Sequence, residues 1–129
     1  MERFFFAMGS LFAALGVAAG AFGAHGLRSL VDAERMTLWE KAVRYQMYHA
    51  LALMLVAWAI TQWWHRAGTL RLGGWFFILG ILLFSGSLYA LTLKGNLTIQ
   101  GVSLGLITPV GGAFFLLGWL ALLIASARA

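Results

Sequence analysis

The sequence predicts an all-α fold, an integral membrane four-helix up-down bundle that forms a single domain over residues 1–129. Composition is the first reason, because 62% of the residues are apolar and only 10% are charged, against about half and about a quarter in soluble domains. The second reason is that the apolar residues are gathered in four long runs. A soluble domain of this length has too little interior for them, whereas in lipid the outward-facing side chains can also be apolar.

The first apolar run covers about residues 4–26 and contains no charged residue. It has the roughly 20 residues that a helix needs to cross a bilayer. The preceding Met1-Glu2-Arg3, together with Ala19-Gly20-Ala21, also resembles a signal peptide with a cleavage site. The run is long for a signal-peptide core, so we expect a retained transmembrane helix.

The polar stretch 28–44 predicts a short amphipathic helix that lies at the membrane interface and runs into the second span. Asp32 is suited to cap its first turn. Glu40 and Arg44 are spaced to pair one turn apart. Apolar residues recur at helical spacing on one side of this helix: Met36, Trp39 and Val43. The alternative is a solvated loop with one helical turn.

The remaining three spans are predicted at about residues 45–64, 72–93 and 102–125. The second span ends in the aromatic and basic run 63–66, which is typical of an anchor at the membrane interface. Residues 67–69 predict a tight turn. Short connections between the four spans favour antiparallel neighbours, with both termini on one side of the membrane.

The formal charge of +5 comes from nine Lys and Arg residues scattered along the chain. The chain has no basic run for nucleic acid, so we expect the lipid bilayer and its anionic headgroups as partners. The cations are nearly balanced between the two predicted sides, although Arg66 and Arg71 in one short loop favour termini inside. The chain has no cysteine, which excludes disulfides, thiolate catalysis and Cys-ligated metals.

Small residues recur along three of the predicted helices, where they allow close helix packing in lipid. The positions predicted to pack helices together are Gly16, Gly20, Gly80, Gly105 and Gly112. Such faces either hold one chain together or build a homo-oligomer or a larger membrane complex.

Polar residues at membrane depth are the candidates for a functional site, because they are costly there without a partner. They form a predicted polar core or ligand site: His25, Tyr45, Gln46, Tyr48, His49, Ser85, Ser87, Tyr89, Thr108 and Pro109. Pro109 predicts a kink in the fourth helix near Leu106. A kink of this kind marks either a solute site with freed backbone groups or a packing feature.

Four interpretations of His25 and His49 follow from the residues. The two imidazoles are sufficient for a haem b, for a divalent metal with Glu40 or Tyr45, or for a proton relay. The fourth, which we favour, is that each histidine bonds to a carbonyl of a neighbouring helix. We therefore predict no cofactor, and the two histidines are weak metal candidates.

No complete catalytic set is present in the sequence. None of the predicted spans contains an acidic residue, so an intramembrane Ser-His-Asp triad is absent. Phosphate-binding, dinucleotide and zinc-protease motifs are also absent. We do not expect an enzyme.

Four segments of the chain resemble the motifs of one family of small membrane proteins, the domain of unknown function 423 family. The segments are GAFGAHGL at 20–27, YQMYHALA at 45–52, GILLFSGSLY at 80–89 and ITPVGG at 107–112, with Gly118-Trp119 after them. The resemblance implies a four-span protein of the bacterial inner membrane, with membrane-bound eukaryotic relatives and no established activity. It supplies no catalytic residues.

The leading functional hypothesis from the sequence is a structural, interaction or accessory subunit that packs through its small-residue faces. A small-solute or ion carrier around His49 and Pro109 is the second hypothesis. A bis-His haem or metal protein is the third.

Overall fold

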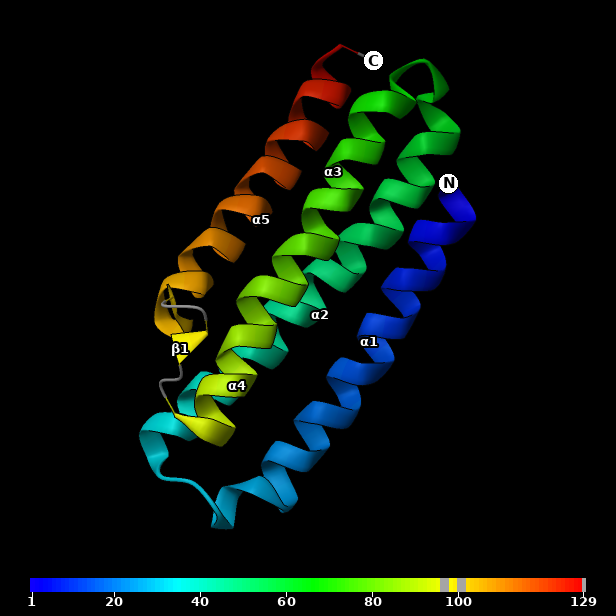
Figure 1. Cartoon of the computed structure of the whole chain (residues 1–129). Coiled ribbons are helices and arrows are strands. Elements are labelled where there is room, and N and C mark those ends of the chain that lie inside the picture. Colours follow the sequence, from blue (N-terminus) through cyan, green and yellow to red (C-terminus); the bar gives the residue numbers. More distant parts are fainter. Residues whose placement is uncertain (96–97, 100–101, 129) are drawn as a thin grey trace.

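The computed structural model describes residues 1–95, 98–99 and 102–128, which fold into a bundle of long helices (Figure 1). The α-helices are α1 (Glu2–His25), α2 (Ala33–Gln62), α3 (Ala67–Gly80), α4 (Gly86–Lys94) and α5 (Leu104–Ala127). Short 3-10 turns, η1 (Leu27–Ser29) and η2 (Trp64–Arg66), connect α1 to α2 and α2 to α3. The π-helical turn η3 (Ile81–Ser85) joins α3 and α4 into one rod.

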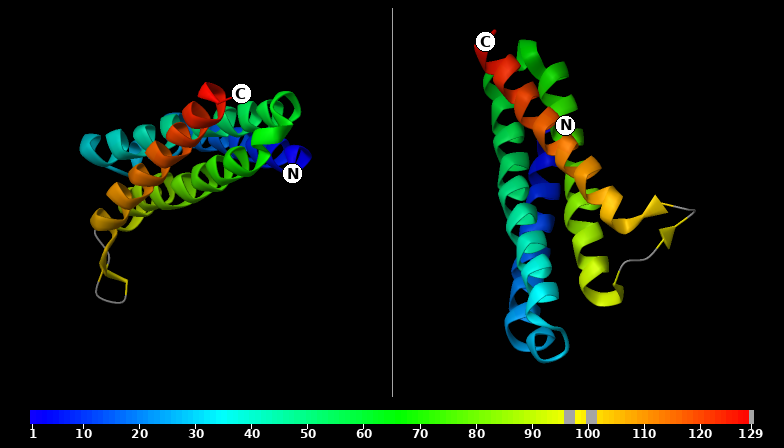
Figure 2. Two further views of the ribbon diagram at one scale, coloured as in Figure 1. Left: turned by 90° about the horizontal axis from the view of Figure 1, so that it is seen from above. Right: turned by 90° about the vertical axis from the view of Figure 1, so that its left-hand side faces the viewer.

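Two short strands, β1 (Thr98–Ile99) and β2 (Val102–Ser103), follow α4 and pair antiparallel. They lie outside the helical bundle (Figure 2). The packed part of the molecule is therefore formed by helices.

The helices form an up-down arrangement. α1 packs chiefly on α2, α2 packs on the α3–α4 rod, and α5 packs on that rod and also contacts α2. Both chain termini lie at one end of the bundle, called here the terminal end (Figure 1). The α1–α2 connection lies at the opposite end, called the loop end. The predicted all-α four-helix fold is confirmed.

Three helical segments of the described chain are long and apolar enough to cross a membrane: Glu2–His25, Trp64–Lys94 and Leu104–Ala127. α2 is longer than the first and third of these, with 30 residues. Polar residues in its middle, among them Gln46 and His49, lower its mean hydropathy.

The predicted interfacial helix is not a separate element. Asp32 caps α2 as expected, because its carboxylate accepts a hydrogen bond from the Arg35 backbone N–H at 2.9 Å. The helix then continues without interruption to Gln62, so the second helix begins at residue 33 rather than at 45. Nothing between Ala33 and Tyr45 is a helix breaker, and the buried Trp39 packs this segment against α1. The predicted pairing of Glu40 with Arg44 does not form among the described residues.

The other predicted boundaries shift by a few residues. The turn predicted at 67–69 is already the first turn of α3, because η2 reverses the chain just before it. The last helix begins at Leu104, and its N-cap is Ser103, whose hydroxyl accepts from the Gly105 N–H at 3.3 Å. α5 runs through Pro109 without a break.

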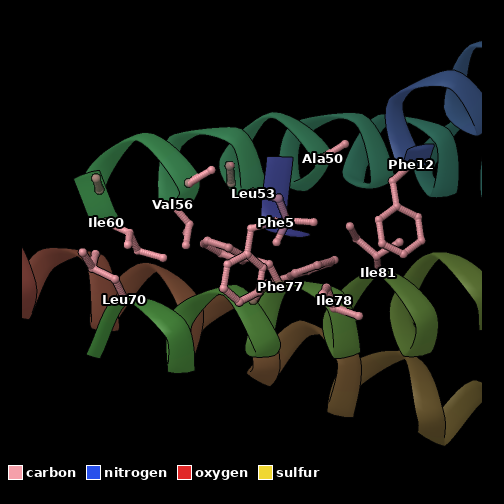
Figure 3. Packing of buried hydrophobic residues seen from close by; sticks show 14 of the residues in the cluster. Phe5, Phe12, Ala50, Leu53, Val56, Ile60, Leu70, Phe77, Ile78 and Ile81 are labelled. Carbon is pink, nitrogen blue, oxygen red and sulfur yellow. The ribbon is translucent and has the colours of Figure 1, made fainter. Parts of the chain in front are cut away.

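The apolar core lies between α1, α2, α3 and α5 towards the terminal end (Figure 3). Phe5 and Phe77 are its largest fully buried side chains. Glycines make room for their rings, because a Cβ at Gly74 would lie 2.5 Å from Phe5 and one at Gly118 would lie 2.5 Å from Phe77. This is close packing through small residues, the kind of contact that holds helices together in lipid.

Candidate functional site

Gln46 is the centre of the polar cluster. It is 5% exposed and lies in the middle of α2. Its amide nitrogen donates to the Phe12 carbonyl on α1 at 2.8 Å, and its amide oxygen accepts from the Tyr89 hydroxyl on α4 at 2.8 Å. One side chain therefore joins three helices, and the two bonds fix which way its amide points.

Trp39 continues this contact towards the loop end. Its indole N–H donates to the Ala19 carbonyl of α1 at 2.8 Å. Its ring packs on the Tyr89 ring with 4.6 Å between centroids. One turn further on in α4, the Thr92 hydroxyl is 3.2 Å from the Arg35 carbonyl of α2. The loop-end halves of α1 and α4 are thus both tied to α2.

His49 occupies the centre of the bundle, and both of its ring nitrogens have partners. Nδ1 is 2.7 Å from the Tyr45 carbonyl and must carry the proton, because a carbonyl only accepts. Nε2 then accepts from the indole N–H of Trp119 on α5, at 3.2 Å. The imidazole stacks on Phe115 with 3.5 Å between centroids and 7° between planes. The geometry defines a neutral imidazole that connects α2 with α5.

Hydroxyl groups make the remaining ties near the π-helical turn. Ser85 ends this turn and donates to the Ala42 carbonyl of α2 at 2.7 Å. Ser87 lies 2.6 Å from Thr108 of α5, oxygen to oxygen. Beside them, a Cβ at Gly111 would collide with the backbone nitrogen of Phe84. The π-helical turn is therefore a place where the α3–α4 rod contacts both α2 and α5.

The side chains of four of the predicted polar-core residues do not take part in this network. His25 ends α1 at the surface, Tyr48 is 54% exposed, and Pro109 is exposed on α5. The Tyr45 ring packs on Phe84 with 4.6 Å between centroids, and only its backbone carbonyl joins the network.

The two histidines are far apart. Gln46 is level with Phe12 on α1, and His25 lies 13 residues further along that helix, which is about 20 Å at 1.5 Å per residue. The Nε2 lone pair of His49 is also taken by Trp119. The described residues contain no group of three His, Cys, Asp or Glu side chains that could hold a metal ion. His25 and His49 are therefore too far apart to ligate one haem or one metal ion together.

The glycines predicted to pack helices differ in their surroundings. A Cβ at Gly80 would collide with the Phe115 ring, and one at Gly16 would touch Met47 at 3.4 Å. Gly20 and Gly112 have only loose contacts, at 3.6 and 3.8 Å, and Gly105 meets only its own cap residue. Five other glycines, which were not predicted to pack helices, leave no room for a Cβ: Gly9, Gly23, Gly74, Gly111 and Gly118.

Three donors of the network were not among the predicted site residues: Trp39, Thr92 and Trp119. Trp39 was assigned only to an apolar face. A buried tryptophan has one N–H that needs an acceptor, and this requirement could have identified Trp39 and Trp119 as donors from the sequence.

Two grooves flank the contact between α1 and α2. The first, of about 380 Å³, lies between α1 and the α3–α4 rod and is almost wholly apolar. Phe12, Leu15 and Leu82 form its walls, and Trp39 and Tyr89 line it further in. We call it the α1–α4 groove. The second, of about 340 Å³, lies between the loop-end halves of α1 and α2 and carries charged residues at its edge.

The fold and the cluster define a class, an all-helical membrane protein whose intramembrane polar side chains are bonded across helices. The family model described as "Protein of unknown function (DUF423)" matches residues 19–112. The chain belongs to this family.

Its relatives are membrane proteins by name, with no activity in their names. The chain is 41% identical to the UPF0382 membrane protein SAB0533 of Staphylococcus aureus, over 96% of this chain and 95% of that protein. It is 42% identical to SERP0230 of Staphylococcus epidermidis, covering 98% and 97%. It is 38% identical to YwdK of Bacillus subtilis, covering 98% of both. No solved structure matches the chain.

Proposed function

We propose that the chain is a four-pass protein of the bacterial inner membrane that works as an interaction subunit, and that its α1–α4 groove receives a transmembrane helix of a partner protein. The observation that carries the proposal is the groove itself, which is open and almost wholly apolar. At Gly86, on its α4 side, a Cβ would find no atom within 4 Å. Bare helix backbone of this kind lets another helix approach closely.

The polar cluster supports this role because its bonding capacity is used inside the chain. Within the described ranges, no buried side-chain nitrogen or oxygen lacks a hydrogen-bond partner. A carrier needs polar groups that are free to bind a solute, whereas Gln46 and His49 bond helices to each other. The continuous α5 at Pro109 gives the carrier hypothesis no broken helix. We include neither transport nor enzymatic activity in the proposal.

Photo-crosslinking in native membranes tests the groove. The chain has no cysteine, so Leu82→Cys in the groove wall accepts a thiol-reactive benzophenone at one position only. Leu106→Cys is the matched control, because Leu106 is similarly exposed, at 64% against 56%, but lies on α5. We expect a discrete protein adduct from residue 82 and none from residue 106. An adduct of twice the chain mass would identify the partner as a second copy.

A second variant pair tests whether the groove must be empty. Gly86→Trp should fill it and abolish the adduct, since the new side chain has space in the folded chain. Gly68→Trp is the control, because a Cβ there also meets nothing within 4 Å but lies outside the groove. Lipid adducts alone at residue 82, or equal protein adducts at residues 82 and 106, would overturn the proposal.

A further inference from the structure

The second groove combines a floor of small residues with charges at its edge. Gly20, Gly23 and Ala24 of α1 line it, and Arg28, Glu40 and Arg44 are its charged residues. It lies between α1 and α2 towards the loop end, on a different set of α1 residues from those that line the α1–α4 groove. It is therefore a separate site, and its occupant need not be the same.

Arg44 lies close to the loop end of α1, where we place the boundary between lipid headgroups and acyl chains. A Cβ at Gly20 would be 3.6 Å from Val43, so this part of α2 is level with Gly20. α1 ends at His25, five residues further on, which is about 7–8 Å along the helix. An arginine at this depth needs an anionic partner or a route to water for its charge.

The described residues supply no anionic partner for these arginines. In the described part of the chain, the one ion pair joins the amino terminus to Glu2. Arg28 and Arg44 therefore have no carboxylate within 4 Å, and Glu40, one turn before Arg44, pairs with neither. Two cations and one anion leave a net charge of +1 at the groove.

We infer that this groove binds one anionic glycerophospholipid of the phosphatidylglycerol type. Its phosphate lies between the guanidinium groups of Arg28 and Arg44, which bond phosphate oxygens in a planar, charge-assisted geometry. Glu40 accepts a hydrogen bond from a hydroxyl of the glycerol headgroup. An acyl chain follows the small residues of α1 towards the membrane centre. This inference does not depend on the helix-binding role, because Trp39 is the one residue that lines both grooves.

Native mass spectrometry of the full chain, released from vesicles of equal phosphatidylglycerol and phosphatidylcholine, tests the site. We expect one phosphatidylglycerol to stay bound, and about a tenfold loss of its retention in the Arg28→Gln/Arg44→Gln variant. The matched control is Arg71→Gln/Arg128→Gln, which removes the same charge at the terminal end. Equal loss in both double variants, or no preference for phosphatidylglycerol in the natural chain, would overturn the inference.

Two further arms separate a lipid site from a general anion site. Gly20→Leu should reduce retention while keeping every charge, because its side chain enters the groove, where a Cβ meets only Val43 at 3.6 Å. Inorganic phosphate in excess should not displace the lipid, because it has no acyl chain. Displacement by phosphate, or full retention in Gly20→Leu, would contradict a lipid site.

Discussion

Towards the terminal end of the bundle, the helices contact one another through aromatic rings seated on glycines, whereas towards the loop end side-chain hydrogen bonds join them. Phe5 on Gly74 and Phe77 on Gly118 represent the first kind of contact. Gln46 with Tyr89 and Ser85 with the Ala42 carbonyl represent the second. On α2 the change falls at His49, which stacks on Phe115 and also bonds to Trp119.

The difference shows how two parts of one membrane bundle solve the same problem. Lipid tails are as apolar as the side chains they surround, so apolar burial alone does not draw helices together. In the apolar region, ring and glycine fit closely and gain dispersion contacts. In the polar region, a donor and an acceptor fix the register of each helix pair, and each such bond contributes roughly 0.6–2 kcal/mol.

The largest effect is expected at the closest approach between helices. Gly111→Ala should lower the free energy of unfolding by about 3 kcal/mol, because its methyl group collides with backbone, which cannot rotate away. Unfolding by SDS in mixed micelles measures this change. Gly112→Ala is the control and should be nearly neutral, since its Cβ lies 3.8 Å from the Phe84 ring. Equal effects at 111 and 112 would mean that α5 does not approach the π-helical turn this closely.

The apolar region predicts the next effect. Phe77→Ala should lower the free energy of unfolding by about 2 kcal/mol. This loss is below the 3–5 kcal/mol typical of soluble cores, because lipid offsets part of the lost transfer free energy, whereas the cost of the cavity remains. Phe6→Ala, at a ring that is 55% exposed, should change little. The same unfolding assay compares the two variants, and a loss at Phe77 no larger than that at Phe6 would contradict the packing described for this region.

Trp39→Phe isolates one tie of the polar region. The substitution removes the N–H that bonds the Ala19 carbonyl and keeps most of the ring contact with Tyr89. We expect a loss of about 1 kcal/mol. Trp58→Phe is the matched control, because Trp58 is 57% exposed. If both variants unfold alike, the indole bond does not stabilise the contact between α1 and α2.

The smallest effect is expected at Ser87. Ser87→Ala breaks the contact with Thr108 and should cost about 0.5 kcal/mol, because Thr108 can turn its hydroxyl to a carbonyl of its own helix. Ser126→Ala, at an exposed serine bonded within its own helix, serves as the control. A loss above about 2 kcal/mol in the same assay would show that this hydroxyl pair does more than join α4 to α5.

Much of the fold follows from the sequence, because apolar run length decides where helices can cross a membrane. The continuity of α2 did not follow. Its polar first part suggested a separate interfacial helix. In the structure this part packs on α1 and buries Trp39, and the sequence alone does not reveal how the two helices are aligned. The π-helical turn was also missed, since the residues Ile81–Ser85 contain no proline or glycine to mark it.

The free-energy cost of a polar side chain inside the membrane identified Gln46, His49 and Tyr89 as candidates from the sequence. The structure brings Gln46 and Tyr89 together. The same argument gave no weight to distance along a helix, so it left open whether His25 and His49 meet, and the structure keeps them apart. The sequence also does not predict which glycines lie at close contacts between helices. Gly111 and Gly112 are neighbours in the chain, and only the rotation of α5 turns one towards Phe84.

A double-mutant cycle on Gln46 and Tyr89 tests most directly whether the polar cluster exists to join helices. The variants are Gln46→Leu, Tyr89→Phe and the pair together, with the free energy of unfolding in mixed micelles as the measurement. The bond between the two side chains predicts a coupling energy of about 1 kcal/mol. Strictly additive losses would contradict a stabilising bond between Gln46 and Tyr89. The two residues would then again be candidates for binding a solute.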